Sequence, residues 1–481
     1  MSTASPSLAH TRGFSTLAEE RTLEDVPVAG MIPQWLCGSL LRTGPAKFEV
    51  GSQSMRHWFD GLAMLHRFTI ASGRVSYANR YLHSRSYRAA REAERIAYSE
   101  FATDPCRSLF KRVQSIFFSS QIPDNANINI AALGQRFIAM TETALPVEFD
   151  PQTLAAARVR PYRAPGQLST AHPHLEKATG RLINYAAKLG PRSSYRFFAI
   201  DPSSGQARVL ATLPVREPAY MHSFGITPNW IVLAEFPFRV NPLRLALAGR
   251  PYIENYRWRP ELGTHFTLIN RNTGKASAPL QTDACFAFHH VNAFEQDEDV
   301  VVDLCTYPDP RLVEDLYLDR LRRGKPIARA ALERYRLTLA DGSVSRQALS
   351  EQPLELPRIN YGRCNEHSYR YVWGTDTGPS GWTEKIIKID TITGAYTVWH
   401  RPGTYPGEAV FVARPEAERE DDGVLLSVVL DSATERSRLL ILNACDLTEL
   451  AEATIPHHVP FNFHGHFAAD SRLTTQPLHQ D

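Results

Sequence analysis

The stretch Ile200-Asp-Pro-Ser-Ser-Gly205 has the form of a β-hairpin turn. An apolar run ends where aspartate and serine can bond to their own backbone and glycine accepts a positive φ. A propeller blade takes about 40–50 residues plus insertions, and this pattern recurs roughly every fifty to eighty residues. Its other copies begin at Phe68, Phe149, Ile269, Leu339, Ile389 and Leu442. Seven hairpins predict an all-β, seven-bladed β-propeller; seven unrelated turns in another all-β fold are the alternative.

Outside these hairpins the apolar runs are short and often alternating, as in strands. Helical patterns are confined to residues 86–99, 310–323 and 325–334, so we expect a few helices and loops to cap the top face of the propeller. We expect residues 1–19 to be an N-terminal tail and residues 20–481 to be a single propeller domain.

The composition is that of a globular protein, with 43% apolar and 22% charged residues. A net charge of +2 gives no reason to expect nucleic acid as a partner. The six cysteines form no CxxC pair, which indicates reduced thiols and a cytoplasmic protein. Neither a secretory signal nor an apolar run of membrane-spanning length is recognisable, so we expect the chain to be soluble or to lie on a membrane.

Four histidines lie in short segments that resemble strand ends or turns. They are His172 in Thr-Ala-His-Pro-His, His222 in Tyr-Met-His-Ser, His289 in Phe-His-His-Val and His464 in Phe-His-Gly-His. The inner strands of a propeller converge on its axis, so residues far apart in sequence can meet there. Four imidazoles suit iron, copper, zinc or nickel better than magnesium or calcium. The segments predict a metal site, although a single histidine is more often a hydrogen-bonded or surface group.

Three glutamates lie in apolar surroundings, where an unpaired carboxylate would be costly. They are Glu142, Glu355 and Glu408. Neutral ligands leave a metal ion its full charge, and carboxylates that accept the second N–H of each imidazole commonly offset it. The three are therefore candidates for this role, and exposed or strand-end positions are the alternative for each one.

Several longer motifs occur in order along the chain. They are Gly38-Ser-Leu-Leu-Arg-Thr-Gly-Pro, His57-Trp-Phe-Asp-Gly, Asp124-Asn-Ala-Asn, the four histidine segments and Glu408-Ala-Val-Phe-Val. From about residue 20 to residue 468 the chain thereby resembles the carotenoid cleavage oxygenase family. It is most similar to the branch of the animal β-carotene oxygenases and the retinoid isomerohydrolase. That similarity rests on Asp104-Pro-Cys-Arg-Ser-Leu-Phe, Phe288-His-His-Val-Asn and Val302-Asp-Leu-Cys.

The resemblance implies a propeller with one Fe(II) on its axis. Matched motif by motif, its ligands are His172, His222, His289 and His464. The supporting carboxylates match Glu142, Glu355 and Glu408. Four imidazoles leave up to two of six coordination positions for water, substrate or the co-substrate O2. Thr141, beside Glu142, is expected to screen one of these positions.

The resemblance also implies a dioxygenase that cleaves a conjugated C=C bond of a carotenoid or apocarotenoid to aldehydes. The central 15,15′ bond of β-carotene, whose cleavage gives retinal, is the first expectation. A polyene has no polar handle, so the length and aromatic walls of a tunnel must select the bond. By similarity the lining includes Phe59, Thr141, Tyr252, Tyr307 and Phe463, each of which is otherwise an ordinary core residue.

A carotenoid dissolved in a bilayer has to be taken up at the membrane surface. Residues 106–118 and 241–250 mix large apolar side chains with arginine or lysine, as interfacial segments do. We therefore expect a cytoplasmic protein that binds membranes peripherally, and the alternative for each segment is an amphipathic helix on the propeller rim.

Three other functions remain open from the sequence. A retinoid isomerohydrolase of the same branch would consume no O2. A stilbene-cleaving oxygenase would need polar groups for a phenol, and none are recognisable in the sequence. A non-catalytic, lipid-binding propeller would need no axial histidines.

Overall fold

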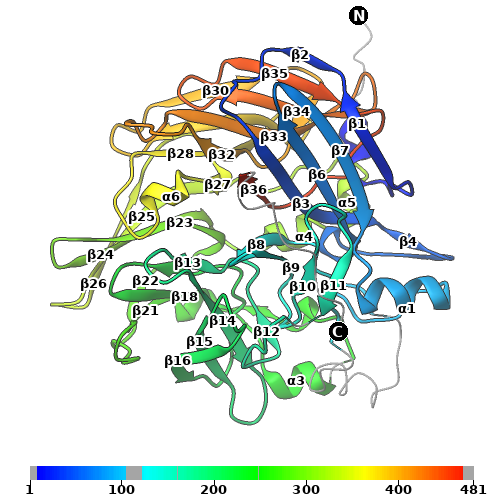
Figure 1. Ribbon diagram of the computed structural model, residues 1–481. Helices are drawn as coiled ribbons and strands as arrows, with labels where there is room; N and C mark the ends of the chain where they lie inside the picture. Colours follow the sequence, from blue (N-terminus) through cyan, green and yellow to red (C-terminus); the bar gives the residue numbers. More distant parts are fainter. Residues whose placement is uncertain (1–7, 105–121, 160, 248, 470–481) are drawn as a thin grey trace, which may run out of the picture.

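Seven β-sheets are arranged around one axis as the blades of a propeller (Figure 1). The computed structural model describes residues 8–104, 122–159, 161–247 and 249–469. Within these residues the seven sheets have four to six strands each, and two short ribbons pair β4 (Glu49–Val50) with β5 (Gln53–Ser54) and β19 (Phe238–Arg239) with β20 (Arg257–Trp258). The predicted seven-bladed fold is confirmed.

The blades are numbered here along the chain, and the strands of each are given from the axis outward. Blade 1 contains β36 (Gly465–Ala469), β3 (Gly38–Lys47), β6 (Leu62–Ala71) and β7 (Arg74–Tyr81), with β1 (Arg21–Val26) outside. Blade 2 contains β8 (Asn129–Leu133), β9 (Arg136–Met140), β10 (Val147–Phe149) and β11 (Ala156–Val159). Blade 3 contains β12 (Leu168–Ser169) with β13 (His174–Glu176), then β14 (Arg181–Lys188), β15 (Ser194–Ile200) and β16 (Ala207–Pro214). Blade 4 contains β17 (Gly225–Ile226), β18 (Trp230–Glu235), β21 (Thr264–Asn270) and β22 (Leu280–Thr282).

The remaining blades follow the same plan. Blade 5 contains β23 (Phe286–Gln296), β24 (Asp299–Tyr307), β25 (Ala331–Thr338) and β26 (Ser343–Ala348). Blade 6 contains β27 (Glu355–Arg358), β28 (Tyr371–Thr377), β29 (Thr383–Asp390) and β30 (Tyr396–His400). Blade 7 contains β31 (Thr404–Pro406) with β32 (Val410–Ala413), then β33 (Gly423–Asp431), β34 (Arg436–Asn443) and β35 (Glu449–Thr454), with β2 (Val28–Gly30) outside.

The two ends of the described chain close the ring together. Strand β36 pairs antiparallel with β3, so the last described strand belongs to blade 1. The two strands lie side by side near the middle of the molecule (Figure 1). On the outside, β1 pairs with β7 of blade 1 while β2 pairs with β35 of blade 7. Closure of this kind leaves few free strand edges.

All seven predicted hairpins are found, and each connects the third and fourth strands of one blade. In blade 3, Asp201 Oδ1 accepts hydrogen bonds from the backbone N–H groups of Ser203 (3.0 Å) and Ser204 (2.8 Å), and Gly205 has φ +67°. Asn270 forms the equivalent turn in blade 4. The side chains that identified the repeat in the sequence are therefore those that fix its turns.

The helices are shorter than the sequence predicts. They are α1 (Arg85–Ala93), α3 (Pro242–Leu247), α4 (Arg311–Asp315), α5 (Leu318–Leu321) and α6 (Tyr361–Cys364), with the 3-10 helices η1 (Leu8–Phe14), η2 (Trp58–Asp60), η3 (Ile253–Asn255) and η4 (Pro260–Leu262). Helix α1 ends early because Glu94 adopts the left-handed conformation, with φ 50°. The prediction of a helix over 325–334 is wrong. Residues 331–338 form β25, since pairing with both β24 and β26 outweighs their local helix propensity.

The N-terminal segment packs against the propeller where it is described. Phe14 is fully buried, and its ring meets Trp58 and Trp382 edge-on at centroid distances of 6.0 and 4.8 Å. The division of the chain into a tail over 1–19 and one domain over 20–481 stays a prediction.

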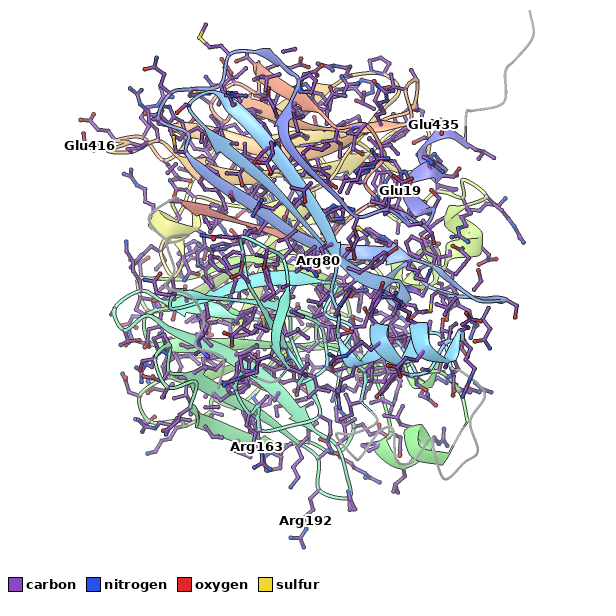
Figure 2. The ribbon with its side chains drawn as sticks, turned by 45° about the vertical axis from the view of Figure 1, so that its right-hand side comes forward. Glu19, Arg80, Arg163, Arg192, Glu416 and Glu435 are labelled. Carbon is purple, nitrogen blue, oxygen red and sulfur yellow. The ribbon has the colours of Figure 1, made fainter. Side chains whose placement is uncertain are left out.

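Charged side chains such as Arg192 and Glu416 project outward from the blades (Figure 2). Among the residues described, none of the helices is both long and apolar enough to cross a membrane.

Candidate metal centre

Four histidines from four blades meet at the axis. His172 lies between β12 and β13, His222 precedes β17, His289 lies within β23 and His464 precedes β36. One ring nitrogen from each forms a group whose members all lie within 4.8 Å of one another. The Nε2 atoms of His172 and His222 are 3.0 Å apart, and those of His289 and His464 are 3.1 Å apart. The structure thus brings together all four histidines that the sequence singles out.

The three predicted glutamates lie directly behind three of these rings. The Nδ1–carboxylate distances are 2.6 Å for His222–Glu142, 2.6 Å for His289–Glu355 and 2.7 Å for His464–Glu408. The glutamates come from blades 2, 6 and 7, and the histidines from blades 1, 3, 4 and 5. Each blade therefore contributes one residue to the centre.

These hydrogen bonds determine which nitrogen of each ring faces the axis. A carboxylate can only accept, so Nδ1 of each paired ring carries the hydrogen and Nε2 of a neutral ring presents its lone pair. The Nε2 atoms of His289 and His464 then face each other at 3.1 Å as two acceptors, and neither can donate to the other. A cation between the rings would relieve this repulsion. The donor set therefore fits a transition metal ion.

Burial favours the neutral form of the imidazoles of His172, His222 and His464. It lowers the pKa of His464 to about 3, against the opposing effect of Glu408. It also lowers the pKa of His222, again opposed by its glutamate, and the pKa of His172, where the neighbouring histidines add to the effect. Neutral imidazole is the form that binds a metal ion.

Two of the glutamates are held by tyrosine hydroxyls. Tyr220 donates to Glu142 Oε1 at 2.6 Å, and Tyr307 donates to Glu355 Oε1 at 3.0 Å. The sequence predicts Tyr307 only as a lining residue and misses Tyr220, although Tyr220 lies two residues before His222. Its spacing from a candidate ligand is the signal that could have identified it.

Glu408 is held differently, by two arginines. It is fully buried, it accepts from Arg358 Nε at 2.7 Å, and Arg42 Nη1 lies 3.6 Å away. Burial raises the pKa of the Glu408 carboxyl, but Arg358, His464 and Arg42 more than offset this, and the net pKa lies well below the ordinary value. The sequence misses both arginines. Arg42 could have been noticed, because a charged residue among the apolar residues of Leu40-Leu-Arg-Thr needs a partner.

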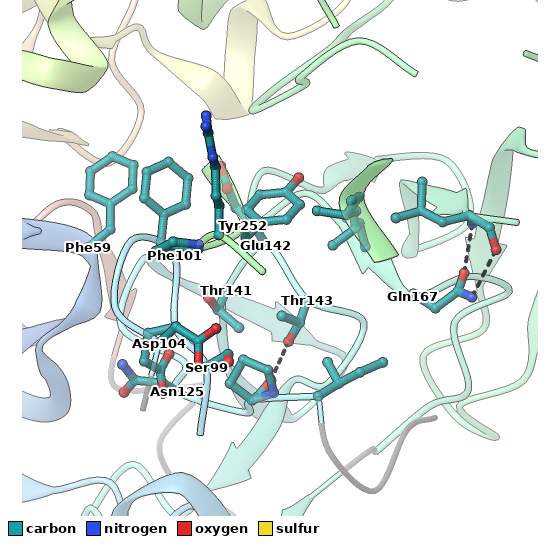
Figure 3. A pocket seen from close by; sticks show the side chains of 18 of the residues that line it. Phe59, Ser99, Phe101, Asp104, Asn125, Thr141, Glu142, Thr143, Gln167 and Tyr252 are labelled. Atoms are coloured by element: carbon teal, nitrogen blue, oxygen red, sulfur yellow. Dashed lines mark hydrogen bonds between the residues drawn. The ribbon is translucent and has the colours of Figure 1, made fainter. Parts of the chain in front are cut away.

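Two cavities adjoin the centre, with about 1060 Å³ and 680 Å³ of empty space. Cavity 1 borders Glu142, and cavity 2 borders His222, His289 and His464. Cavity 1 is lined by Phe101, Ile128, Glu142, Leu245 and others (Figure 3). Cavity 2 is lined by Phe288, Leu312, His289, His464 and others. Both have the largely apolar lining of sites that enclose small organic molecules.

All five predicted lining residues lie on these cavities. Thr141 and Tyr252 line cavity 1, Tyr307 and Phe463 line cavity 2, and Phe59 lines both. Figure 3 shows Phe59 beside Phe101, with a centroid distance of 5.1 Å. The screening role expected of Thr141 stays a prediction.

Comparison with known proteins agrees with this geometry. The family model described as retinal pigment epithelial membrane protein matches residues 14–469. Human β,β-carotene 15,15′-dioxygenase is 35% identical over 513 aligned residues, covering 93% of each chain, and the carotenoid isomerooxygenase of Galleria mellonella is 35% identical over 92% of each chain. A cobalt-substituted apocarotenoid oxygenase (ACO) of Synechocystis has a similar structure, with a TM-score of 0.85 and 27% identity over 97% of this chain and 99% of its own. The chain therefore belongs to the carotenoid oxygenase family and is an oxygenase.

Proposed function

We propose that the protein is a non-haem Fe(II) dioxygenase that cleaves one conjugated C=C bond of a carotenoid or apocarotenoid to two aldehydes. The observation that carries this proposal is the convergence of four imidazoles beside the apolar cavity 2. His172, His222, His289 and His464 would hold one iron ion per chain. When bound, ferrous iron would supply the electrons that activate O2 toward an electron-rich double bond.

The protein's own residues position and shield the reactants. Glu142, Glu355 and Glu408 accept the Nδ1–H groups and so keep three Nε2 lone pairs aimed at the axis. The aromatic walls, among them Phe59 and Phe463, exclude water and orient a polyene that offers no polar group to grip. Thr141 would screen one open coordination position from its place beside Glu142 on cavity 1.

Central cleavage of β-carotene to retinal is the reaction we infer first. The human, rat and mouse relatives named β,β-carotene 15,15′-dioxygenase, each 35% identical, support this choice. A second candidate is cleavage coupled to isomerisation, because a relative named carotenoid isomerooxygenase is equally similar. The configuration of the retinal product distinguishes the two.

We expect purified protein reconstituted with Fe(II) to convert β-carotene to retinal under ¹⁸O2, with label in both aldehyde groups. Prompt reduction to the alcohols prevents exchange with water, and a reciprocal run in H2¹⁸O is the control. Mass spectrometry reads the label, and chromatography separates cis from trans products. Longer apocarotenals would indicate an eccentric cut. Turnover of a retinyl ester without O2 consumption would contradict the proposal in favour of isomerohydrolysis.

We also infer that the protein is cytoplasmic and takes its substrate from a membrane surface that it binds peripherally. Of the two predicted interfacial segments, residues 106–118 lie outside the described residues. The other contains α3, where Leu245 lines cavity 1 and Leu243 is 63% exposed. An apolar residue that points outward beside the wall of the cavity supports contact with lipid there. The five cysteines of the described residues are free thiols, which suits the cytoplasm.

Leu243→Asp is expected to weaken binding to phospholipid vesicles by about tenfold or more, since burying a leucine side chain contributes about 1.5–3 kcal/mol. Ile392→Asp is the matched control, because Ile392 is similarly exposed (73%) but lies in the hairpin of blade 6. Flotation with liposomes measures the bound fraction. Equal binding by Leu243→Asp and wild type would remove α3 from the membrane contact.

A further inference from the structure

The motif Asp124-Asn-Ala-Asn127 contains two buried asparagines whose carboxamides donate hydrogen bonds to the turn at residues 59–61. Asn127 Nδ2 donates to the carbonyl oxygens of Phe59 and Gly61, both at 2.8 Å. Asn125 Nδ2 donates to the carbonyls of Asp60 (3.2 Å) and Gly61 (3.0 Å). Every carbonyl from residue 59 to residue 61 is therefore bound by this motif, and both asparagines are buried.

The same turn is tied to a second segment through the Asp60 carboxylate. Its Oδ1 accepts from Ala102 N–H at 2.9 Å, and its Oδ2 accepts from the Thr103 hydroxyl at 2.6 Å and from His57 N–H at 3.0 Å. Asp60 is fully buried, and burial raises its pKa to about 6 despite these hydrogen bonds. Burying a carboxylate here costs stability, and sequences keep such costly groups chiefly where they serve function.

Packing fixes the turn from its other side as well. A Cβ atom added at Gly61 would lie 2.6 Å from Pro45 Cβ and 2.7 Å from the ring of Phe48. The backbone at Gly61 thus lies against these two side chains, and the carboxamides hold it there. The turn has little freedom to move toward or away from the cavities.

The side chain that this turn carries is Phe59, the wall shared by both cavities. Its ring lies 6.4 Å from that of His222, 4.9 Å from that of Phe463 and 5.9 Å from that of Phe288, measured between centroids. Ile128 follows the motif directly in the sequence and lines cavity 1. Its carbonyl accepts a hydrogen bond from the backbone N–H of His464 at 3.2 Å. One buried polar network therefore connects the shared wall to the histidine centre.

We propose that Asn127, together with Asn125 and Asp60, is a positioning residue that fixes Phe59 at the junction of the two cavities and so determines which double bond lies beside the histidines. This inference rests on the proposed cleavage of polyenes. Neighbouring double bonds of a polyene differ little in chemistry, so the position of the wall selects among them. Misplacement of a reacting group by about 1 Å can cost on the order of 100-fold in rate.

The test compares Asn127→Ala with a matched buried asparagine. Asn292 also donates from Nδ2 to two backbone carbonyls, those of Cys364 (2.9 Å) and His367 (2.8 Å), but neither of these two residues lines either cavity, whereas Phe59 lines both. We expect Asn127→Ala to keep the wild-type iron content, to lower kcat/KM for β-carotene about 10- to 100-fold, and to raise the share of eccentric products several-fold. Asn292→Ala is expected to keep the wild-type product ratio.

Phe59→Leu provides a second variant that leaves the carboxamide network intact. We expect it to shift the product ratio in the same direction, and the double variant Asn127→Ala/Phe59→Leu to add little further shift, since both act through one wall. A wild-type product ratio in Phe59→Leu, or an equal shift in Asn292→Ala, would overturn the inference. Absence of polyene cleavage by the wild type would instead overturn the proposed function.

Discussion

His289→Ala is expected to purify without iron and without cleavage activity. His289 lies within the long inner strand β23, and its Nε2 faces that of His464 at 3.1 Å, so the variant would lose one of the four converging nitrogens. Loss of an outer partner of a ligand already costs about 10–100-fold in metal affinity, and loss of the ligand itself is expected to cost more. Metal analysis of protein purified without oxygen, followed by turnover of β-carotene, measures both effects.

The adjacent histidine provides the control. His290 Nδ1 bonds to the Ser223 hydroxyl at 2.8 Å, outside the group of four converging nitrogens. His290→Ala is therefore expected to bind close to one iron per chain. An iron-loaded and fully active His289→Ala protein would show that the ligand assignment is wrong.

Glu408→Ala is expected to lower the free energy of unfolding by about 3–5 kcal/mol, the usual cost of leaving a buried charge without its partner. Arg42 and Arg358 both face this carboxylate, and Arg42 is as fully buried as Glu408 itself. His464 Nδ1 and the backbone N–H of Gly465 would lose their acceptor in the same variant. Guanidinium denaturation of the metal-free protein measures the loss.

Glu142→Ala is the matched comparison, because Glu142 also accepts from a histidine but is held by the Tyr220 hydroxyl instead of by arginines. Its loss is expected to cost about 1–3 kcal/mol, as for an unsatisfied buried hydrogen-bonding group. The pKa of Glu408 is lowered from its ordinary value of 4.5, so its stabilising effect is complete above that pH and is lost as the pH falls below it. Equal losses for the two variants at pH 7 would contradict the role assigned to the arginines.

The fold could be predicted because its repeating signal is local. In six of the seven blades an aspartate or asparagine accepts hydrogen bonds from the backbone of the turn that follows it, as Asp201 does from Ser203 and Ser204. In blade 1 the turn is formed by Ser72 and Gly73, both with positive φ. The helix expected over 325–334 is wrong for the opposite reason. Residues 331–338 form a strand because they pair with β24 and β26 on either side, and no local sequence pattern reveals this pairing.

The same difference between local and long-range information applies to the candidate site. Histidines and glutamates in unusual apolar segments could be identified one by one, and all seven lie at the axis. The carboxylate partners of Tyr220, Arg42 and Arg358 could not be predicted, because each faces a residue distant in sequence only after folding. Arg358 is the clearest case, since it bonds to Glu408 and to the carbonyl of Gly465, 107 residues further along the chain.

Closure of blade 1 by β36 has a consequence for biosynthesis. The innermost strand of this blade follows His464, whereas its next three strands lie within residues 38–81. A nascent chain on the ribosome therefore has only three of the four imidazoles available until the segment with His464 has left the exit tunnel. The four-histidine group is complete only when that segment folds onto β3, so a metal ion bound there would join blades made early and late in synthesis.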